Sequence, residues 1–539
     1  MSEQMDIIRT ATAHGASTSV TVRDSVIQLL RAFNMTTVFG NPGSTELPLY
    51  QNWPADFRYI LGLQESVVVA MADGYAQATH NAAFVNLHSA AGVGHALGSI
   101  YTAYRNRTPL VITAGQQTRS MLPTDPFLFA ESAAEFPKPY VKWSIEPARA
   151  QDVPAAIARA YYTAMQPPCG PTFVSIPADD WDQPGDYVSP RLLSFSIRPD
   201  PKLLASIANA LDYSRNPAFV VGPAIDRCRA WDLVVHLAER INASVWASPK
   251  SSRCSFPEDH PQFAGFLAAE RSVIAAELSQ HDVVLVLGAP AFSYHVETGG
   301  PFLAPETSLY QIVDDPELAA WAPGGTALVG SLDLSIADLL NLVQTPDRRS
   351  RRSRVAPPRI QASTAISVDY LMQTVAETRP ANSIIVEEAP SSRSAMQRHL
   401  PICRGESFYA TASGGLGFGL PAAVGVALAQ RDRRTIALIG DGSSMYAIQA
   451  LWTAAQCELP MTIVLVRNGT YAALRGLGKR LGTQSLVGVD LPDIDFVALA
   501  LGHGCEGIRV ENGTDLRSAL ERAMQSASPS LVEVVVERS

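Results

Sequence analysis

Two residues with oxygen-bearing side chains, Asp441 and Asn468, stand at a spacing that could hold a metal ion. Asp441 lies between two glycines in GDGS, and Asn468 follows in RNGTY. The runs TIALIG (435–440) and MTIVLV (461–466) predict parallel strands joined by a helix over 443–456. Both side chains would then follow the carboxyl ends of neighbouring strands, the edge where open sheets bind ligands. A carboxylate, an amide oxygen and a backbone carbonyl suit Mg²⁺, which takes further ligands from a diphosphate.

Other glycine-rich readings of these stretches are weaker or stay open. Gly442 opens the predicted helix, whose free backbone amides favour an anion. A Walker-type phosphate loop requires Gly-Lys-Ser/Thr, and no lysine follows these glycines. GVGHALG (92–98) is similar to a dinucleotide fingerprint, but no acidic residue stands between Gly92 and Thr124 to bind a ribose. Asp and Gly are ordinary turn residues, so a plain turn at Gly-Asp-Gly remains an alternative.

The elements that must position these residues fall into three blocks of alternating strand and helix patterns. Such alternation predicts an α/β fold with parallel sheets flanked by helices. We expect domains at 17–190, 195–345 and 361–539, with an Arg- and Pro-rich linker at 346–360. The first and third blocks share the order strand, glycine loop, helix, proline, strand. This similarity indicates an internal duplication, although any two βαβ units look alike.

Composition limits the class of protein. The chain has 539 residues, is 47% apolar and 17% charged, and carries a net charge of −9. This balance suits a well-buried globular protein and gives no reason to expect binding to nucleic acid or to an anionic membrane. Its six cysteines are scattered without metal-binding spacing, and we see neither a signal peptide nor a membrane-spanning run. We therefore expect a soluble protein of the cytoplasm.

Several motifs in order along the chain resemble the thiamine-diphosphate-dependent 2-oxo acid decarboxylase family, and within it the benzoylformate decarboxylases. Besides GDGS and RNGTY, they are VFGNPGSTELP, LQESVVVAMADGYAQ, NLHSAAGVG, KWSIEPA, GAPAFSYH and ASGGLGFGLPAAVGV. The resemblance covers nearly the whole chain. It implies a pyrimidine-binding domain, a Rossmann-like middle domain and a diphosphate-binding domain. It also implies active sites shared between subunits of a homo-oligomer, at least a dimer and commonly a tetramer.

The resemblance assigns cofactor roles to matching residues. Asp441, Asn468 and the carbonyl of Thr470 would bind Mg²⁺. Leu416 would support the cofactor as an apolar wedge, and the carbonyl of Gly414 would receive the pyrimidine amino group. The remaining residues implied in cofactor binding are Pro390, Ser391, Gly442, Ser443 and Tyr471.

The resemblance also assigns four catalytic residues. Glu65 would share a proton with the cofactor's pyrimidine ring, although by spacing alone it could simply cap a helix. His88 and His295 would transfer protons near neutral pH, and either one alone is more often structural. Ser44 would hydrogen-bond the substrate, although without the family context it is an ordinary turn residue.

The chain departs from the family pattern at several positions. Arg467 and His95 stand where the family usually has asparagine. Ala410, Leu477 and Gly476 replace larger aromatic residues, which should enlarge a substrate pocket that also includes Ser44 and Ala473. We expect decarboxylation of an aromatic or bulky 2-oxo acid to an aldehyde and CO₂. The alternatives are a carboligase or lyase acting on 2-hydroxyketones and a non-catalytic relative that binds the cofactor.

Overall fold

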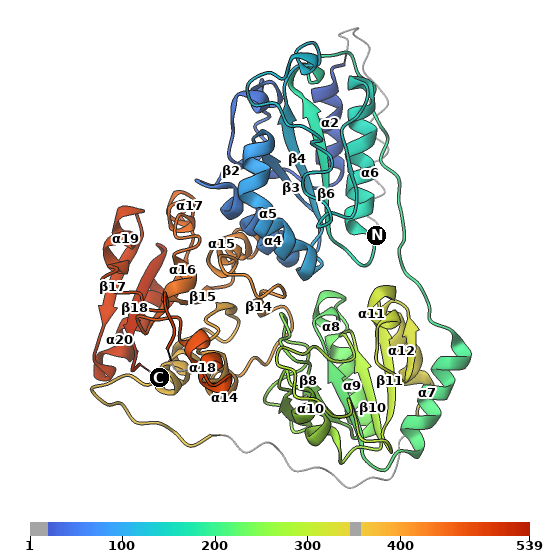
Figure 1. Ribbon diagram of the computed structural model, residues 1–539, viewed down its shortest axis with the longest axis vertical. Helices are drawn as coiled ribbons and strands as arrows, with labels where there is room; N and C mark the ends of the chain where they lie inside the picture. The colour runs from blue at the N-terminus through green and yellow to red at the C-terminus, as the bar shows by residue number, and fades with distance from the viewer. Residues whose placement is uncertain (1–19, 345–356, 484, 539) are drawn as a thin grey trace.

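Three six-stranded parallel sheets, each flanked by helices, form the protein (Figure 1). The structure is a computed structural model that describes residues 20–344, 357–483 and 485–538. This architecture confirms the predicted fold class. The predicted linker at 346–360 lies mostly outside the described residues, and the exact domain boundaries stay predictions. No helix among the described residues is long and apolar enough to cross a membrane.

The first sheet has the strand order β2-β1-β3-β4-β6-β5. Its strands are β1 (Thr37–Gly40), β2 (Arg58–Leu61), β3 (Ala83–Leu87), β4 (Leu110–Gln116), β5 (Ser144–Ile145) and β6 (Pro171–Pro177). The flanking helices are α2 (Val22–Ala32), α3 (Leu47–Tyr50), α4 (Glu65–Thr79), α5 (Ser89–Asn106) and α6 (Val153–Met165). Strands β3, β4 and β6 are buried along their whole length, as expected for a sheet covered on both faces.

The middle sheet has a different order, β12-β11-β10-β7-β8-β9. Its strands are β7 (Pro217–Val221), β8 (Ser244–Ala247), β9 (Phe263–Phe266), β10 (Val283–Leu287), β11 (Ser308–Val313) and β12 (Thr326–Val329). The helices are α7 (Pro201–Tyr213), α8 (Ala224–Arg227), α9 (Trp231–Ile241), α10 (Arg271–Leu278), α11 (Pro316–Ala320) and α12 (Leu332–Leu342). These elements form the green and yellow part of Figure 1.

The third sheet has the order β14-β13-β15-β16-β18-β17, which repeats the order of the first sheet and supports the duplication. Its strands are β13 (Ile384–Glu388), β14 (Phe408–Ala410), β15 (Thr435–Gly440), β16 (Met461–Arg467), β17 (Glu506–Val510) and β18 (Ser530–Val535). The helices are α13 (Val368–Thr378), α14 (Arg393–His399), α15 (Gly419–Ala429), α16 (Asp441–Ser444), α17 (Ala450–Gln456), α18 (Ala472–Arg480), α19 (Phe496–Gly502) and α20 (Gly513–Gln525).

One sequence-based expectation about the third domain is wrong. The single helix predicted over 443–456 is two short helices, α16 and α17, separated by turns. The backbone N–H groups of Tyr446 and Ala447 bond to carbonyls three residues earlier, at Ser443 and Ser444, and this tighter winding interrupts the α-helix.

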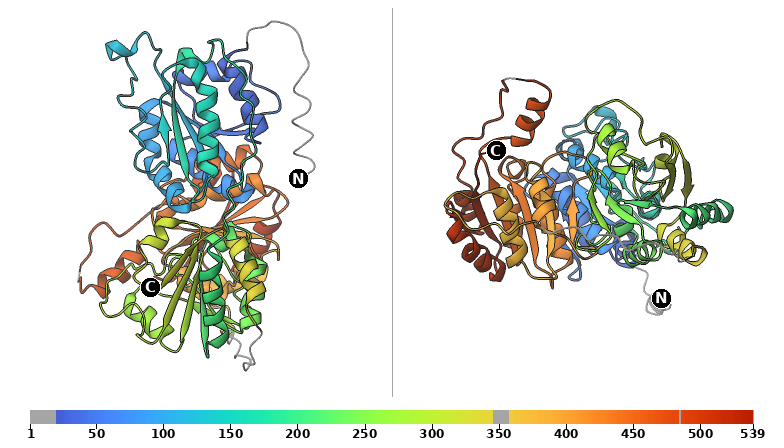
Figure 2. Two further views of the ribbon diagram at one scale, coloured as in Figure 1. Left: turned by 90° about the vertical axis from the view of Figure 1, so that its right-hand side faces the viewer. Right: turned by 90° about the horizontal axis from the view of Figure 1, so that it is seen from below.

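The first and third domains share one hydrophobic core, which is centred on helices α4 and α15. The blue ribbon of the first domain and the orange ribbon of the third lie against each other in both views of Figure 2. A Cβ atom added at Gly74 would lie 2.2 Å from the carbonyl oxygen of Ala422, and one at Gly425 would lie 1.9 Å from that of Met71. The two helices therefore touch backbone to backbone, which only glycine permits. Because position 74 meets 422 and position 71 meets 425, the helices run antiparallel.

We predict that Gly425→Ala destabilises the protein, because the new methyl group would force α4 and α15 apart. The expected loss is about 1–3 kcal/mol, the range for an overpacked core. Urea unfolding followed by circular dichroism measures it. Gly502→Ala is the matched control, because Gly502 is also helical and a Cβ there meets nothing within 4 Å. Equal stability of Gly425→Ala and wild type would contradict the backbone contact.

Candidate active site

Asp441 and Asn468 meet at the carboxyl edge of the third sheet. Gly440 pairs with Val466 in the β15–β16 register, so both side chains leave the same edge. The Asp441 carboxylate accepts hydrogen bonds from the backbone N–H groups of Gly442 (2.8 Å), Asn468 (3.0 Å) and Gly469 (2.7 Å). This carboxylate therefore holds both the GDGS turn, in which Asp441 lies, and the start of the RNGTY turn.

The chemistry of this edge suits a hard cation. Burial raises the pKa of Asp441, while the three backbone N–H bonds and the charge of Arg467 oppose the rise. Asn468 directs its side-chain oxygen back to the N–H of Thr470 (3.1 Å), and its amide nitrogen lies 3.5 Å from Ser391 Oγ. Carboxylate, amide and carbonyl oxygens are all hard donors, and a divalent cation would offset the cost of the buried charge. The residues present therefore fit Mg²⁺.

The other predicted residues of the third domain surround this edge. Ser443 is buried in α16. The ring of Tyr471 packs directly on Gly442, because a Cβ atom added to this glycine would lie 2.5 Å from Cε1 of the ring. Pro390 and Ser391 are exposed on the turn after β13. Gly414 and the half-buried Leu416 lie on the 411–417 loop, which connects β14 to α15. Gly414 has a φ of +75° and open space around it.

Sequence reasoning missed two buried glutamates at the end of β13. Glu388 accepts hydrogen bonds from the backbone N–H groups of Gly417 (2.7 Å), Phe418 (2.7 Å) and Gly419. Glu387 accepts one from the N–H of Ala389 (2.7 Å) and pairs with Arg393. Glu388 therefore anchors the end of the 411–417 loop, while Glu387 shapes the turn that carries Pro390 and Ser391.

A second half-site lies in the first domain at the start of α4. The alternative that Glu65 caps this helix is wrong, because Gln64 caps it by accepting from the N–H groups of Ser66 (2.7 Å) and Val67 (3.3 Å). The Glu65 carboxylate instead lies 3.0 Å from Nδ1 of His95, and its side chain is 13% exposed. This contact shows where the unusual His95 acts: directly on a predicted catalytic carboxylate.

His88 is held by another glutamate that sequence reasoning missed. Its Nδ1 lies 2.8 Å from Oε2 of the buried Glu46 and 3.2 Å from Thr45 Oγ1. The hydroxyl of Thr45 already donates its proton to Glu46 Oε1 (2.6 Å). Thr45 Oγ1 and the carboxylate oxygen Glu46 Oε2 can therefore only accept a hydrogen bond from the imidazole. The proton of a neutral His88 therefore sits on Nδ1, and Nε2 is the basic nitrogen. Ser44 is exposed one residue before Thr45.

The glycine of NPGST explains why this histidine can sit so close to the turn. A Cβ atom on Gly43 would lie 2.1 Å from Nδ1 of His88, so the ring packs directly on the turn backbone. The N–H of Gly43 also donates to Glu46 Oε2 (3.0 Å). The signal that could have identified Glu46 is its position three residues after a glycine, where a glutamate can accept a turn N–H.

The predicted substrate-pocket residues lie partly at the junction of the middle and third domains. Arg480 of α18 forms an ion pair with Glu270 (2.8 Å), and Glu270 pairs with Val296, which follows His295. The exposed His295 therefore belongs to the surface beside α18.

Within α18, Ala473 is exposed and Leu477 is half-buried, whereas Ala410 is buried in the core of the third domain. A Cβ added at Gly476 would meet nothing within 4 Å.

The two half-sites lie at opposite ends of the α4–α15 contact. At about 1.5 Å per residue, the stretches from Met71 back to Glu65 and from Gly425 back to Gly419 each run about 9 Å, in opposite directions. This separates the starts of the two helices by roughly 18 Å. Gly419 and Asp441 belong to the third-domain edge, so one chain does not bring Glu65 to its own predicted metal ligands.

The unusual Arg467 is structural. Its Nη1 lies 2.7 Å from Glu533, which is fully buried in β18 and also pairs with Arg509 (2.9 Å). Arg467 thus compensates a buried carboxylate, while the neighbouring Asn468 remains at the sheet edge.

Domain models of thiamine pyrophosphate enzymes match the chain in three places: the N-terminal TPP binding domain at 20–132, the central domain at 204–339 and the C-terminal TPP binding domain at 390–534. The sequence is 43% identical to benzoylformate decarboxylase from Pseudomonas aeruginosa, over 95% of this chain and 98% of that protein.

Two solved structures resemble the whole chain. Benzoylformate decarboxylase from Polynucleobacter necessarius has a TM-score of 0.94 and 39% identity, over 96% of this chain and 99% of that one. The thiamine diphosphate-dependent 4-hydroxybenzoylformate decarboxylase of Rhodococcus jostii RHA1 has a TM-score of 0.93 and 41% identity, over 96% and 100%.

The ionisation of Glu388 gives a prediction about pH. Burial raises its pKa from the ordinary 4.5 to about 7, although three backbone N–H bonds oppose the shift. The associated stability is fully present below about pH 4.5 and is lost as the pH rises through about 7. The unfolding free energy of wild type minus that of Glu388→Gln should therefore fall by roughly 3 kcal/mol over this range. Urea titrations at a series of pH values measure the difference, and a difference that rises with pH would contradict the shift.

Proposed function

This chain belongs to the thiamine pyrophosphate enzyme family, and we propose that it decarboxylates an aromatic or bulky 2-oxo acid, without oxidation, to an aldehyde and CO₂. The observation that carries this proposal is the orientation of His88, whose Nδ1 is occupied by the buried Glu46. An imidazole fixed in this way offers a defined basic nitrogen for proton transfer. The names of its relatives, which act on benzoylformate and 4-hydroxybenzoylformate, indicate the substrate class.

The chain's residues divide the work between binding and proton transfer. Asp441, Asn468 and the carbonyl of Thr470 would hold Mg²⁺ and, through it, the diphosphate of the cofactor. When bound, thiamine diphosphate supplies the electron sink that a 2-oxo acid needs in order to lose CO₂. Glu65, at the start of α4, would share a proton with the pyrimidine ring of the cofactor, and Nε2 of His88 would carry a proton to or from the substrate.

The substrate-facing groups come from both half-sites. Ser44 Oγ would hydrogen-bond the substrate carboxylate or carbonyl, and His295 would serve a second proton transfer that assists product release. The open space at Gly476 and the small side chain of Ala473 favour a bulky acid, because volume removed from a pocket wall becomes available to the substrate. Of the other two departures, Leu477 acts in the same direction, while Ala410 lies in the core of the third domain.

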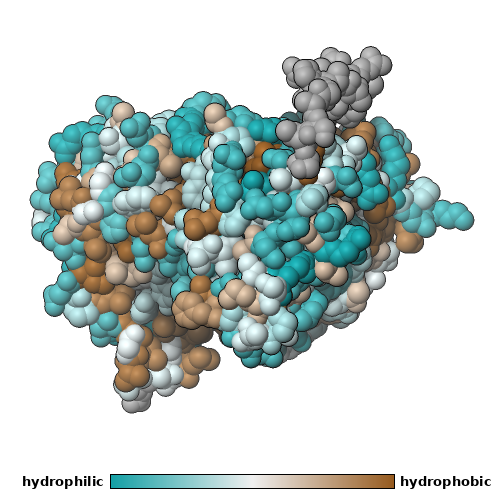
Figure 3. Space-filling view, turned by 90° about the horizontal axis from the view of Figure 1, so that it is seen from above, coloured by the Kyte–Doolittle hydropathy of each residue, from teal (hydrophilic) through white to brown (hydrophobic). Residues whose placement is uncertain are grey.

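We further propose that a second copy of the chain completes each site, in a dimer at least and, as the family resemblance implies, a tetramer. The separation of Glu65 from Asp441 within one chain supports this. Exposed apolar side chains also flank both half-sites: Leu47 and Leu63 in the first domain, and Met445, Tyr446 and Leu474 in the third. Apolar residues gather on the face of the molecule that Figure 3 shows. Such exposure is expected of a surface that another chain covers.

Two further proposals concern the whole chain. We propose a cytoplasmic location, because all six cysteines are free. We also propose the domain boundaries 17–190, 195–345 and 361–539, since each sheet lies within one of these ranges.

The direct test measures CO₂ release with added thiamine diphosphate and Mg²⁺ across 2-oxo acids from pyruvate through benzoylformate to larger aryl and branched acids. We expect release to peak on an aromatic or bulky acid and to fall by about 10²–10⁴-fold in Glu65→Gln, the usual contribution of one acid–base group. Glu521→Gln is the control, because Glu521 lies on the surface of α20. No release from any acid, with the cofactor shown to be bound, would contradict the decarboxylase and favour a carboligase or a non-catalytic relative.

A further inference from the structure

The 411–417 loop, which carries Gly414 and Leu416, is held by the first domain of the same chain. The backbone N–H of Ala412 donates to Oδ1 of Asn106 (2.8 Å), and Ser413 Oγ lies 2.9 Å from Thr102 Oγ1. Thr102 already donates to the carbonyl of Gly98 (3.0 Å), so Ser413 must donate to Thr102. Both contacts come from the last turns of α5, far along the chain from the loop.

The orientation of the Asn106 amide is set by a buried carboxylate. Asn106 Nδ2 donates to Asp73 Oδ2 (2.9 Å), and Asp73 also accepts from Thr108 Oγ1 (2.6 Å) and Gln77 Nε2 (2.8 Å). Asp73 is fully buried on α4. An ionised carboxylate can only accept hydrogen bonds, so Asn106 must present its NH₂ group to Asp73 and its oxygen to the loop.

We propose that Asp73 and Asn106 are positioning residues for the cofactor: Asp73 orients Asn106, and Asn106 fixes the backbone of the loop that carries Gly414. The inference rests on the proposed function only in assigning this loop to the cofactor, since the hydrogen bonds do not depend on that assignment. Neither residue contacts the predicted metal ligands, and both stand in the first domain rather than the domain that they organise.

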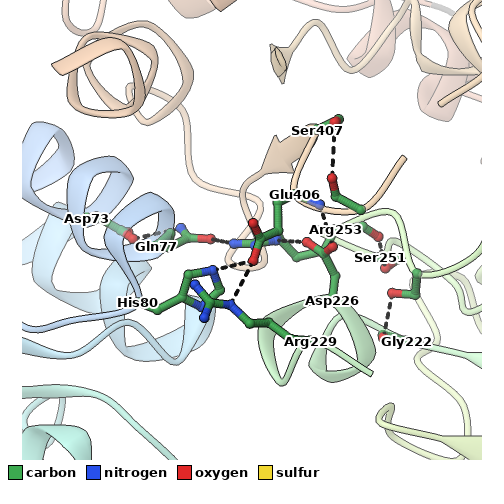
Figure 4. Close-up of polar contacts among 12 residues, drawn as sticks. Asp73, Gln77, His80, Gly222, Asp226, Arg229, Ser251, Arg253, Glu406 and Ser407 are labelled. Carbon is green, nitrogen blue, oxygen red and sulfur yellow. Dashed lines mark hydrogen bonds and ion pairs between the residues drawn. The ribbon is translucent and has the colours of Figure 1, made fainter. Parts of the chain in front are cut away.

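The middle domain also reaches Asp73 through Gln77 (Figure 4). Arg253 Nη1 donates to Gln77 Oε1 (2.8 Å), which leaves the Gln77 NH₂ group for Asp73. Arg253 is itself held by Asp226 (2.7 Å) and stacks over the ring of Tyr409 at 4.1 Å. The loop, α4 and the middle domain therefore share one polar network at the junction of the three domains.

The environment of Asp73 makes this network sensitive to pH. Burial raises the pKa of Asp73 to about 6, while the bonds from Thr108, Gln77 and Asn106 and the charge of Arg253 oppose the rise. Arg253 is the charged group that acts on Asp73. Arg107, between Asn106 and Thr108, pairs instead with Asp315 (2.6 Å).

Among the described neighbours of α4, the charged groups of α5 are paired or exposed: His95 pairs with Glu65, and Arg105 is exposed. The α15 sequence GLPAAVGVALA, which packs against α4, has no titratable side chain, and His80 at the end of α4 pairs with Glu406 (2.6 Å). A protonated Asp73 is neutral and therefore a weaker acceptor for the three donors that converge on it, so its hold on Asn106 weakens. The loop should therefore be held most firmly above about pH 6 and loosen as the pH falls through that value.

Amide hydrogen exchange of the full-length, cofactor-free protein tests the proposal, because it reports the hold on the loop without any turnover. In Asn106→Ala, the protection factor of the Ala412 amide should fall roughly tenfold, the usual effect of losing one buried hydrogen bond. Asn81→Ala is the control, since Asn81 is a partly buried asparagine whose bonds to described residues, Phe33 and Tyr161, stay within the first domain. Unchanged protection in Asn106→Ala would overturn the proposal.

Asp73→Asn tests the orienting role and replaces Asn106→Ala if that variant does not fold. This substitution keeps the volume of the side chain but replaces one carboxylate oxygen by an NH₂ group, which faces the donors of Asn106, Thr108 and Gln77. The protection factor of the Ala412 amide should therefore be low at every pH. Wild-type protection, corrected for intrinsic exchange, should fall between about pH 8 and about pH 5. Glu388 holds the other end of the loop and has a pKa of about 7, so a wild-type fall that persists unchanged in Asp73→Asn would assign the pH dependence to Glu388 and overturn the role of Asp73.

Titration of the same proteins with thiamine diphosphate and Mg²⁺ separates this inference from the proposed function. We expect Asn106→Ala to bind the cofactor several-fold more weakly than Asn81→Ala, because the loop must be ordered on binding. If Asn106→Ala loosens the loop but binds the cofactor with unchanged affinity, Asn106 holds the loop, and the claim that it positions the cofactor is overturned. Loss of binding in wild type as well would instead contradict the proposed function.

Discussion

The backbone contact between α4 and α15 is the constraint on which the arrangement of the molecule depends. Gly74 and Gly425 let two apolar helices approach until backbone meets backbone, which merges the cores of the first and third domains. Because the helices run antiparallel, the start of α4 points away from the start of α15. The contact therefore fixes how the first and third domains pack together, and it also separates Glu65 from Asp441. This separation is the reason why we propose that a second copy of the chain completes each site.

Buried carboxylates shape the loops of both half-sites. Glu46 fixes the NPGST turn and His88, Glu388 fixes the end of the 411–417 loop, and Asp441 fixes the RNGTY turn. In each case the acidic side chain accepts backbone N–H groups that no strand or helix satisfies. A buried carboxylate is costly unless it is paired in this way, so the loop and its carboxylate hold each other in place. Asp73 extends this principle across a domain boundary, because it acts on the loop through Asn106.

The sequence predicts the parts of this design that follow from periodicity and spacing. The strand at 435–440 has the predicted ends and the strand at 461–467 is one residue longer than predicted, and the parallel register brings Asp441 and Asn468 to one edge. The alternating strand and helix patterns likewise predict the fold class and the duplication of the first and third blocks, but not the order of the strands in each sheet. Residue spacing could not decide whether Glu65 caps its helix, because the neighbouring Gln64 is also able to cap it.

Other features depend on contacts between distant segments and leave no local pattern. Glu46 and Glu388 look like ordinary acidic residues, because their backbone partners are fixed only in the folded chain. The break between α16 and α17 arises from turns that the apolar periodicity of 443–456 conceals. The sequence of neither helix predicts that α4 and α15 pack against each other in antiparallel directions.

The most direct test of the account mixes two inactive variants, Glu65→Gln and Asp441→Asn, by unfolding and refolding them together. If each site takes Glu65 from one chain and Asp441 from another, a mixed dimer contains one site with both native residues. Random mixing should then recover about a quarter of the wild-type decarboxylase activity. If both residues of a site came from the same chain, no mixed dimer would contain an intact site. Mixtures as inactive as the separate variants, with mixed dimers shown to form, would contradict the account.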